Sequence, residues 1–286
     1  MILNARISNG FTTSDGLTFT NGESTMVTVG GGGNVDGYPV TRPSIVLDPV
    51  DNSRNVLKFT STCPTDTYLT NLTRSQVDLV SPSWIKTLAE KWLLWDIYIP
   101  SATVNSGHMV AILSIYSNNS GAPAIRPGCF HAFIGDGLDG VPVGMVGFRS
   151  NTSAWYPRLV VNVPSEKFLD RWAEIVVNID LEGTNKDGCV HIWLDGELIY
   201  SAVRVNTVYT DTVDVHYKPG GVYFWGTSPS SGEWYSYSAG MVIGDSEFKT
   251  FNQFTSAANA RTQQSKSGEY SGNPSISFSG KDYGKN

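Results

Sequence analysis

From residue 56 onward, the chain consists of short runs in which apolar and polar residues alternate, and Gly, Asn, Ser and Pro separate the runs. The clearest runs cover residues 56–60, 92–99, 109–116, 130–134, 143–148 and 158–163. Alternation with a period of two is typical of strands that bury one face, and the separating residues favour tight turns. The sequence therefore predicts a mainly β protein.

The composition supports the same fold class. The 286 residues include 29 Gly and 14 Pro, and 12% are aromatic while only 16% are charged, which suits many short strands joined by turns. Sandwiches of this length commonly form a single domain. We expect a sandwich over residues 1–254 with one short helix near residues 84–91. Residues 255–286 are almost empty of aliphatic side chains and are expected to form an extended polar arm.

Charge and cysteine content exclude several classes. The formal charge of −6, with no basic run longer than two residues, argues against a nucleic-acid partner. Cys63, Cys129 and Cys189 have no Cys-x-x-Cys spacing and no two histidines have metal-ligand spacing, so we predict free thiols, no metal and no cofactor. Residues 1–6 lack the pattern of a secretory signal, and no apolar run approaches the roughly 20 residues that span a bilayer.

The most regular local pattern lies between residues 172 and 200. The apolar run 172–180 is followed by the turn residues 185–188, the run 189–194, the pair Asp195-Gly196 and the run 197–200. Asp-Gly pairs favour the positive backbone angles of hairpin turns. The segment is predicted to form three consecutive antiparallel strands.

This segment resembles the back-sheet hairpins of concanavalin A-like sandwiches. The resemblance rests on a strand that begins with Trp172, a Gly-bearing turn, and the run Val-His-Ile-Trp-Leu-Asp-Gly-Glu that ends at Glu197. Lectins, laminin-type domains and polysaccharide lyases share this pattern, so it implies an all-β, concanavalin A-like jelly-roll sandwich and no particular chemistry.

A second resemblance concerns one strand. The run Tyr217-Lys218-Pro-Gly-Gly-Val-Tyr223 resembles the Tyr-x-Lys-x-Gly-x-Tyr strand of jelly-roll polysaccharide lyases, the alginate-lyase and heparin-lyase-like group. It has one extra residue between Lys218 and Tyr223. A β-bulge at Gly220-Gly221 could absorb that residue, since two glycines tolerate the required backbone angles.

Those lyases carry two further motif strands, Arg-x-Glu and Gln-Ile-His. Residues 73–77 resemble the first, with Arg74 kept and Gln76 in place of Glu. In the run 111–116, Ser114 stands where the second has Gln and Tyr116 where it has His. The resemblance therefore implies that Arg74 would hold the substrate carboxylate. It also shows that this chain lacks the histidine of the lyase motif and has Tyr116 in its place.

The chemistry of a uronate lyase explains these residue types. Such an enzyme removes the C5 proton next to a carboxylate and expels the O4 substituent, so it must neutralise the carboxylate and move a proton. If this chain is active, Tyr223 is the preferred proton carrier, with Tyr116 or His216 replacing the absent histidine. Arg74 or Lys218 nearby would lower the pKa of a catalytic tyrosine.

Aromatic side chains complete the predicted site. Flat rings stack on sugar rings while their polar edges stay hydrated. The predicted glycan-binding residues are the following: Gln76, Ser114, His216, Tyr217, Trp225 and Trp234. The alternative for each aromatic residue is packing in the core of the sandwich.

We predict a glycan-binding, lyase-like sandwich that recognises an acidic polysaccharide, without ordinary lyase catalysis because the Gln and His positions have changed. One alternative is an active lyase that cleaves uronic-acid polymers by β-elimination, and another is a purely structural virion protein. The arm, residues 255–286, is expected to dock in a homo-oligomer or on virion neighbours, or to be ordered only by crystal contacts. With no export signal, the expected location is a phage virion, as a decoration or tail component, or the extracellular space.

Overall fold

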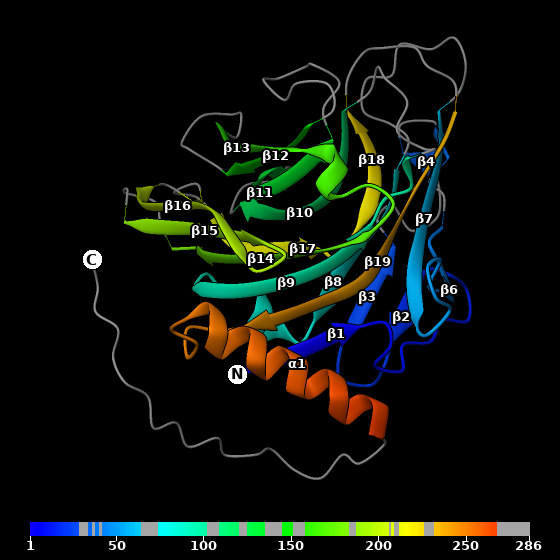
Figure 1. The fold of residues 1–286 in the computed structure, drawn as a ribbon, viewed down its shortest axis with the longest axis horizontal. Coiled ribbons are helices and arrows are strands. Elements are labelled where there is room, and N and C mark those ends of the chain that lie inside the picture. Colours follow the sequence, from blue (N-terminus) through cyan, green and yellow to red (C-terminus); the bar gives the residue numbers. More distant parts are fainter. Residues whose placement is uncertain are drawn as a thin grey trace.

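The computed structural model describes most of the chain, in the following ranges: residues 1–28, 34–35, 38–39, 42–63, 74–101, 109–119, 125–134, 145–150, 158–182, 187–205, 207–208, 212–225 and 232–267. Two curved antiparallel sheets face each other, and a single long helix lies against one of them (Figure 1). The predicted β-sandwich is confirmed.

Within the described residues, sheet A has eight strands. In spatial order they are β16 (Glu197–Val205), β15 (Gly188–Leu194), β14 (Trp172–Asp180), β9 (Glu90–Tyr98), β19 (Gly232–Gly244), β7 (Asn55–Cys63) and β6 (Ser44–Leu47), while β1 (Ile2–Arg6) pairs with β19.

Sheet B has nine described strands. In spatial order they are β13 (Arg158–Pro164), β12 (Met145–Ser150), β11 (Ile125–Ile134), β10 (Met109–Asn119), β17 (Thr212–Lys218), β8 (Arg74–Ser81), β3 (Thr25–Thr28) and β2 (Thr18–Thr20), while β18 (Gly221–Trp225) pairs with both β10 and β8. A separate two-stranded sheet joins β4 (Asn34–Val35) and β5 (Tyr38–Pro39).

The hydrophobic core lies between sheets A and B. Along β9, Leu93, Trp95 and Ile97 belong to this core, because successive side chains of a strand point to opposite faces. Trp95 stacks on Phe130 of β11 in the opposite sheet, with ring centroids 6.2 Å apart. Each sheet therefore keeps one outer face on which polar side chains can be placed.

The predicted strands are confirmed, including the three consecutive strands that become β14, β15 and β16. The short helix expected near residues 84–91 is only partly correct. A 3-10 helix, η1, covers Ser83–Lys86, and from Glu90 the chain is already in β9. The reason is the run that follows, whose alternating apolar residues pack into the sandwich core. A second 3-10 helix, η3, covers Ser165–Lys167.

The expectation of an extended arm is wrong for residues 255–267, which continue α1 (Phe251–Ser267). Phe254 and Ala258, four residues apart and so on one helix face, are fully buried against Trp92 and Leu94 of β9. Phe251, at the start of α1, stacks on Trp193 of β15, so a few apolar side chains dock a segment that is otherwise polar. Residues 268–286 lie outside the described part of the chain.

A kink separates β17 from β18. Ser114 of β10 pairs with Lys218, and Ala111 pairs with Tyr223, so five residue steps on the interrupted strand oppose three on β10. The strand is interrupted close to the predicted place, but two residues interrupt it, Pro219 and Gly220, and Gly221 already belongs to β18.

Contacts from sheet A hold this kink in place. The Ser238 hydroxyl donates to the carbonyl of Pro219 at 2.5 Å, and the Ser236 hydroxyl donates to the carbonyl of Gly221 at 2.9 Å. A Cβ atom on Gly220 would lie 2.7 Å from Ser238 Cβ. Only glycine fits at this position, so packing between the sheets fixes where β18 begins.

Of the three cysteines, the side chain of Cys189 is described, and it is a half-buried free thiol. Burial raises its pKa to about 11. Among the described helices, none has the length and apolar character needed to cross a bilayer.

Candidate functional site

The three strands that resemble lyase motifs are neighbours in sheet B. The order β10, β17 with β18, and β8 places β17 and β18 between the other two. Tyr116 pairs with His216, Ser114 with Lys218, and Gly221 with Gln76. Residues that are far apart in sequence are thus brought to one part of the sheet.

Their side chains share the outer face of sheet B. On β10, Leu113 and Ile115 belong to the core between the sheets, so Ser114 between them faces outward. The same alternation places Lys218 opposite in direction to the buried neighbour Tyr217. We call the outward side chains the sheet-B site, which consists of Gln76, Asp78, Ser114, Tyr116, His216 and Lys218.

Lys218 supplies the positive charge of the sheet-B site. It is only 4% exposed, and its Nζ atom lies 4.6 Å from the centroid of the Tyr116 ring. Tyr116 is itself 8% exposed. A cation over an aromatic face is attracted by the negative charge of the ring face.

Three buried polar atoms of the sheet-B site have no hydrogen-bond partner: Nε2 of Gln76, Oγ of Ser114 and Oδ1 of Asp78. The two that can donate, Gln76 Nε2 and Ser114 Oγ, belong to residues that are 1% and 0% exposed. An unpaired donor buried in a protein costs about 1–3 kcal/mol, and a ligand that accepts from it recovers that cost. Both atoms therefore point to a polar ligand with acceptor oxygens.

Gly221 permits the position of Gln76. A Cβ atom on Gly221 would lie 2.5 Å from Gln76 Cγ and 3.0 Å from the carbonyl oxygen of Ser75. Because Gly221 has no side chain, the Gln76 side chain can lie across the backbone of β18. The glycine of the motif-like run thus determines the location of the amide.

A histidine and a carboxylate form a second part of the sheet-B site. His216 Nδ1 lies 2.7 Å from Asp78 Oδ2, and His216 Nε2 lies 3.8 Å from Asp214 Oδ1. The histidine and Asp78 side chains are 16% and 13% exposed. An imidazole whose Nδ1–H is held by a carboxylate has a fixed ring orientation and keeps Nε2 for other partners.

Three predicted site residues can be placed only by their backbone. Arg74 pairs with Tyr223 across β8 and β18, and Trp225 pairs with Met109 across β18 and β10. The Arg74–Tyr223 pair lies two residues along β8 from Gln76, and the Trp225–Met109 pair lies further along the sheet. The side chains of Arg74, Tyr223 and Trp225 lie outside the described part of the structure.

Two predicted glycan contacts lie in the core instead. Tyr217 is 0% exposed, faces the opposite direction to Lys218, and donates its hydroxyl to the carbonyl of Ile85 at 2.9 Å. Trp234 is 3% exposed and belongs to the core between the sheets. Neither side chain can reach a ligand on the outer face, and neither belongs to the sheet-B site.

Asp78 was not among the predicted residues. It lies two residues beyond Gln76 on β8, and period-two alternation places it on the same face as Gln76 and Arg74. That signal was available in the sequence. The partner was not, because only strand pairing brings His216 beside it.

In the part of the chain that the structure describes, no group of three His, Cys, Asp or Glu side chains could hold a metal ion. The side chains of the sheet-B site supply one ammonium, one amide, two hydroxyls, one imidazole and one carboxylate.

Comparison with solved structures finds proteins to which parts of this chain are similar. The endo-β-1,4-glucuronan lyase of the fungus Trichoderma reesei aligns with a TM-score of 0.54 and 15% sequence identity, over 71% of this chain and 87% of that chain. The alginate lyase vAL-1 from Chlorella virus aligns with a TM-score of 0.45 and 10% identity, over 71% of this chain and 89% of its own. The botulinum neurotoxin serotype D binding domain gives a TM-score of 0.49 and 13% identity, over 89% of this chain and 53% of that chain.

The sequence matches no protein-family model and no curated protein. At 15% identity, the likeness to the glucuronan lyase concerns the fold alone. The predicted concanavalin A-like jelly-roll sandwich, with the architecture of polysaccharide lyases, is confirmed. The ligand and the chemistry must be argued from the side chains.

Proposed function

We propose that the sheet-B site recognises an acidic polysaccharide. The observation that carries the proposal is the pair of buried, unpartnered atoms Gln76 Nε2 and Ser114 Oγ beside the Lys218 ammonium. A uronate carboxylate has two acceptor oxygens and a negative charge. It could accept from the amide and the hydroxyl while it pairs with the ammonium.

The charge of Lys218 supports an anionic ligand over a neutral sugar. Lys218 is 4% exposed, and its ammonium lies over the ring of Tyr116, which is itself 8% exposed. A positive charge attracts a carboxylate more strongly than it attracts a hydroxyl group.

Binding to a panel of polymers tests the proposal. Affinity electrophoresis or calorimetry of the wild-type protein with alginate, glucuronan and heparin is expected to show binding of at least one of them. The Lys218→Met variant is expected to bind it much more weakly. Failure of every acidic polymer to bind a folded protein would contradict the proposal and favour a purely structural role for the sandwich.

A second candidate function, β-elimination, is favoured by the His216–Asp78 pair. In the tautomer in which Nδ1–H donates to Asp78, Nε2 of His216 is free to accept the C5 proton of a uronate. The electron pair of the C5–H bond would move toward the carboxylate and then form the C4–C5 double bond as the C4–O4 bond breaks. The Tyr223 hydroxyl, the proton carrier expected from the sequence, would give its proton to the leaving O4. Asp214, 3.8 Å from Nε2, would stabilise the imidazolium that forms.

The unsaturated uronate made by this reaction absorbs in the ultraviolet, so activity is measured directly. An absorbance rise that His216→Gln and Tyr223→Phe each abolish, while polymer binding remains, would establish the enzyme. His191→Gln on sheet A is the matched control, because His191 pairs with Ser201 and is remote from β17. Binding without any absorbance rise would confirm recognition without catalysis.

We also propose, from the sequence, that this module acts in a phage virion as a decoration or tail component. The site would then attach the particle to an acidic polysaccharide on its host. Mass spectrometry of purified virions should detect the chain. Its absence from particles, with the protein free in the lysate, would assign the module to the extracellular space.

A further inference from the structure

The outer face of sheet A carries a row of aromatic rings that the sheet-B site does not use. Trp172 of β14 pairs with Tyr98 of β9, and Tyr98 pairs with Tyr237 of β19. The ring centroids of each pair are 5.8 Å apart, and Tyr235 lies 6.0 Å from Tyr237. All four residues are half-buried. We call them the aromatic row.

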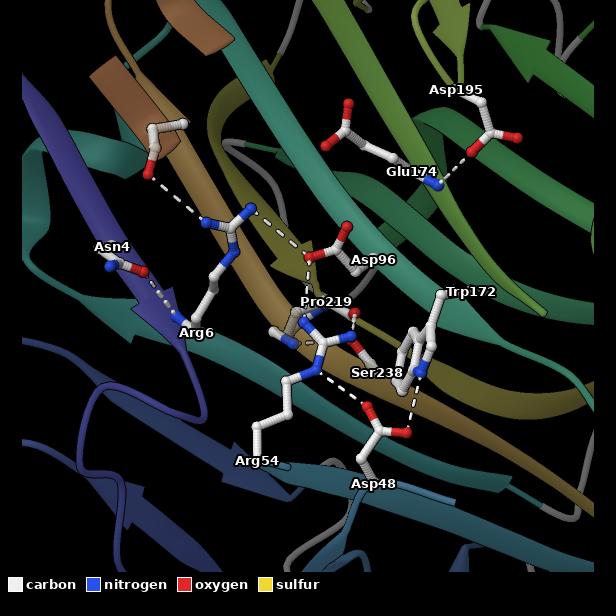
Figure 2. A network of polar contacts seen from close by, with 12 residues as sticks. Asn4, Arg6, Asp48, Arg54, Asp96, Trp172, Glu174, Asp195, Pro219 and Ser238 are labelled. Atoms are coloured by element: carbon white, nitrogen blue, oxygen red, sulfur yellow. Dashed lines mark hydrogen bonds and ion pairs between the residues drawn. The ribbon is translucent and has the colours of Figure 1, made fainter. Parts of the chain in front are cut away.

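Charged groups hold one end of the aromatic row in place (Figure 2). The Arg54 guanidinium lies 4.5 Å from the centroid of the Trp172 ring, and its Nε donates to Asp48 Oδ2 at 3.0 Å. The indole N–H of Trp172 donates to the other oxygen of Asp48 at 3.0 Å. The tryptophan and the guanidinium are thus fixed before any ligand arrives, which lowers the entropy cost of binding.

The charges near the row are balanced. Asp96 lies 3.5 Å from Arg6 and 3.8 Å from Arg54 (Figure 2), and Arg171 lies 2.8 Å from Asp195. At the other end, the Lys58 ammonium lies 5.0 Å from the centroid of the Tyr235 ring. This surface carries both hydrogen-bond donors and acceptors, and its positive and negative charges largely cancel. The sheet-B site differs because it is built around the Lys218 ammonium.

We propose that the aromatic row is a second carbohydrate-binding surface, and that its ligand is an uncharged stretch of polysaccharide. Tyr98 and Tyr237 would pack against the C–H faces of sugar rings, and the guanidinium of Arg54, whose side chain is 27% exposed, would donate hydrogen bonds to hydroxyl groups. Balanced charge favours an uncharged ligand, since a charged one would meet as much repulsion as attraction.

A sugar fits this surface better than a protein partner. The core of a protein interface is apolar, with charged residues depleted. The exposed large hydrophobic side chains among the described residues are Met1, Leu47, Val50, Leu198 and Val203, and none of them belongs to the row. Charged side chains flank the rings instead, an arrangement suited to a ligand that carries a hydroxyl on almost every carbon.

Affinity electrophoresis in gels that contain hydroxyethyl cellulose, xyloglucan or galactomannan tests the proposal. The wild-type protein is expected to be retarded by at least one of these neutral polymers. The double variant Tyr98→Ala, Tyr237→Ala should bind it about tenfold more weakly, because two aromatic contacts contribute roughly the free energy of a tenfold change. The matched double variant Tyr98→Phe, Tyr237→Phe keeps both rings and should bind within about threefold of wild type.

The two surfaces are distinguished by variants that should each lose binding to one class of polymer only. Lys218→Met should keep neutral-polymer binding, and the double alanine variant should keep binding to uronate polymers. Retardation by none of the neutral polymers would overturn the proposal, as would full retention by the alanine variant. So would self-association of the wild type that the alanine variant abolishes, because the occupant would then be a second copy of the chain.

Thermal unfolding establishes that each variant is folded. If the double alanine variant does not fold, the single Tyr237→Ala variant and a competition experiment with wild type decide the question. Uronate oligosaccharides should leave neutral-polymer binding unchanged, since the two surfaces lie on opposite sides of the sandwich. Displacement by those oligosaccharides would place both ligands in one site and contradict the proposal.

Discussion

The two outer faces of the sandwich use polar residues in different ways. On sheet B, Gln76 and Ser114 keep buried donors without partners beside Lys218. On sheet A, α1 covers one part of the face, and in the remaining part Arg54, Asp48 and Asp96 satisfy one another. Unpaired donors next to a buried charge predict a ligand that completes them. Paired charges around aromatic rings instead predict a preformed surface on which a ligand stacks.

The largest expected effect concerns the part of sheet A that α1 covers. Phe254→Ala removes a fully buried ring that packs on Trp92 and should lower the free energy of unfolding by about 3 kcal/mol or more. Denaturant unfolding measures this. The control is Ser256→Ala, an exposed helix position where the change should stay within about 0.5 kcal/mol. Equal stability of the two variants would show that α1 does not stabilise the sandwich.

The next largest effect concerns the charge of the sheet-B site. Lys218→Met should weaken acidic-polymer binding by about 2 kcal/mol, some thirtyfold, because it removes a charge-assisted contact. The matched control, Lys58→Met, removes the same charge from sheet A and should leave that affinity unchanged. If both variants weakened binding equally, the attraction would come from overall charge and the two faces would not differ.

A pair of buried serines tests the role of the unpaired donors. Ser114→Ala should reduce acidic-polymer affinity by about 1 kcal/mol, roughly fivefold, yet leave the melting temperature unchanged or raise it, because its hydroxyl has no partner in the free protein. Ser236→Ala breaks a hydrogen bond to Gly221 and should instead lower stability by about 1 kcal/mol without a direct effect on the ligand. Destabilisation by Ser114→Ala would show that the hydroxyl has a structural role.

The smallest expected effect is a dependence on pH near the aromatic row. Burial, and to a lesser extent Asp96, raise the pKa of Glu174 above its ordinary value of 4.5, although Arg6 opposes this. A raised pKa in the folded state means that ionised Glu174 opposes folding, so its stabilising contribution is present below pH 4.5 and is lost as the pH rises through the folded-state pKa.

Glu174→Gln should therefore raise the melting temperature at neutral pH, and the gain should vanish in acid. Glu23→Gln, an exposed substitution, is the control and should show no gain at either pH. A Glu174→Gln variant that is less stable at neutral pH would contradict this, because it would mean that the attraction of Arg6 for the ionised carboxylate outweighs the cost of burial.

The alternation of side-chain direction along a strand could have shown, from the sequence, that Tyr217 faces the core and Lys218 faces outward. Tyr217 and Lys218 are adjacent, so a strand must send them to opposite faces. Tyr217 lies two residues after Val215, so the two side chains point to the same face of the strand. Val215 is fully buried, and Tyr217 is therefore the core residue. The same reasoning would have added Asp78 to the face of Gln76. Trp234 had no such signal, because aromatic residues at 234, 235 and 237 occupy both faces of β19.

By itself, the sequence determined the fold class, most of the strands, the hairpins between β14 and β16, and the approximate place of the interruption between β17 and β18. These depend on side-chain period and turn residues, which are local properties. The tertiary structure alone decided which strands are neighbours. Only strand pairing brings Gln76, Ser114 and Lys218 to neighbouring strands of sheet B, and only packing of α1 on sheet A turns a largely polar segment into a docked helix. Register and burial depend on residues distant in sequence, and no local pattern encodes them.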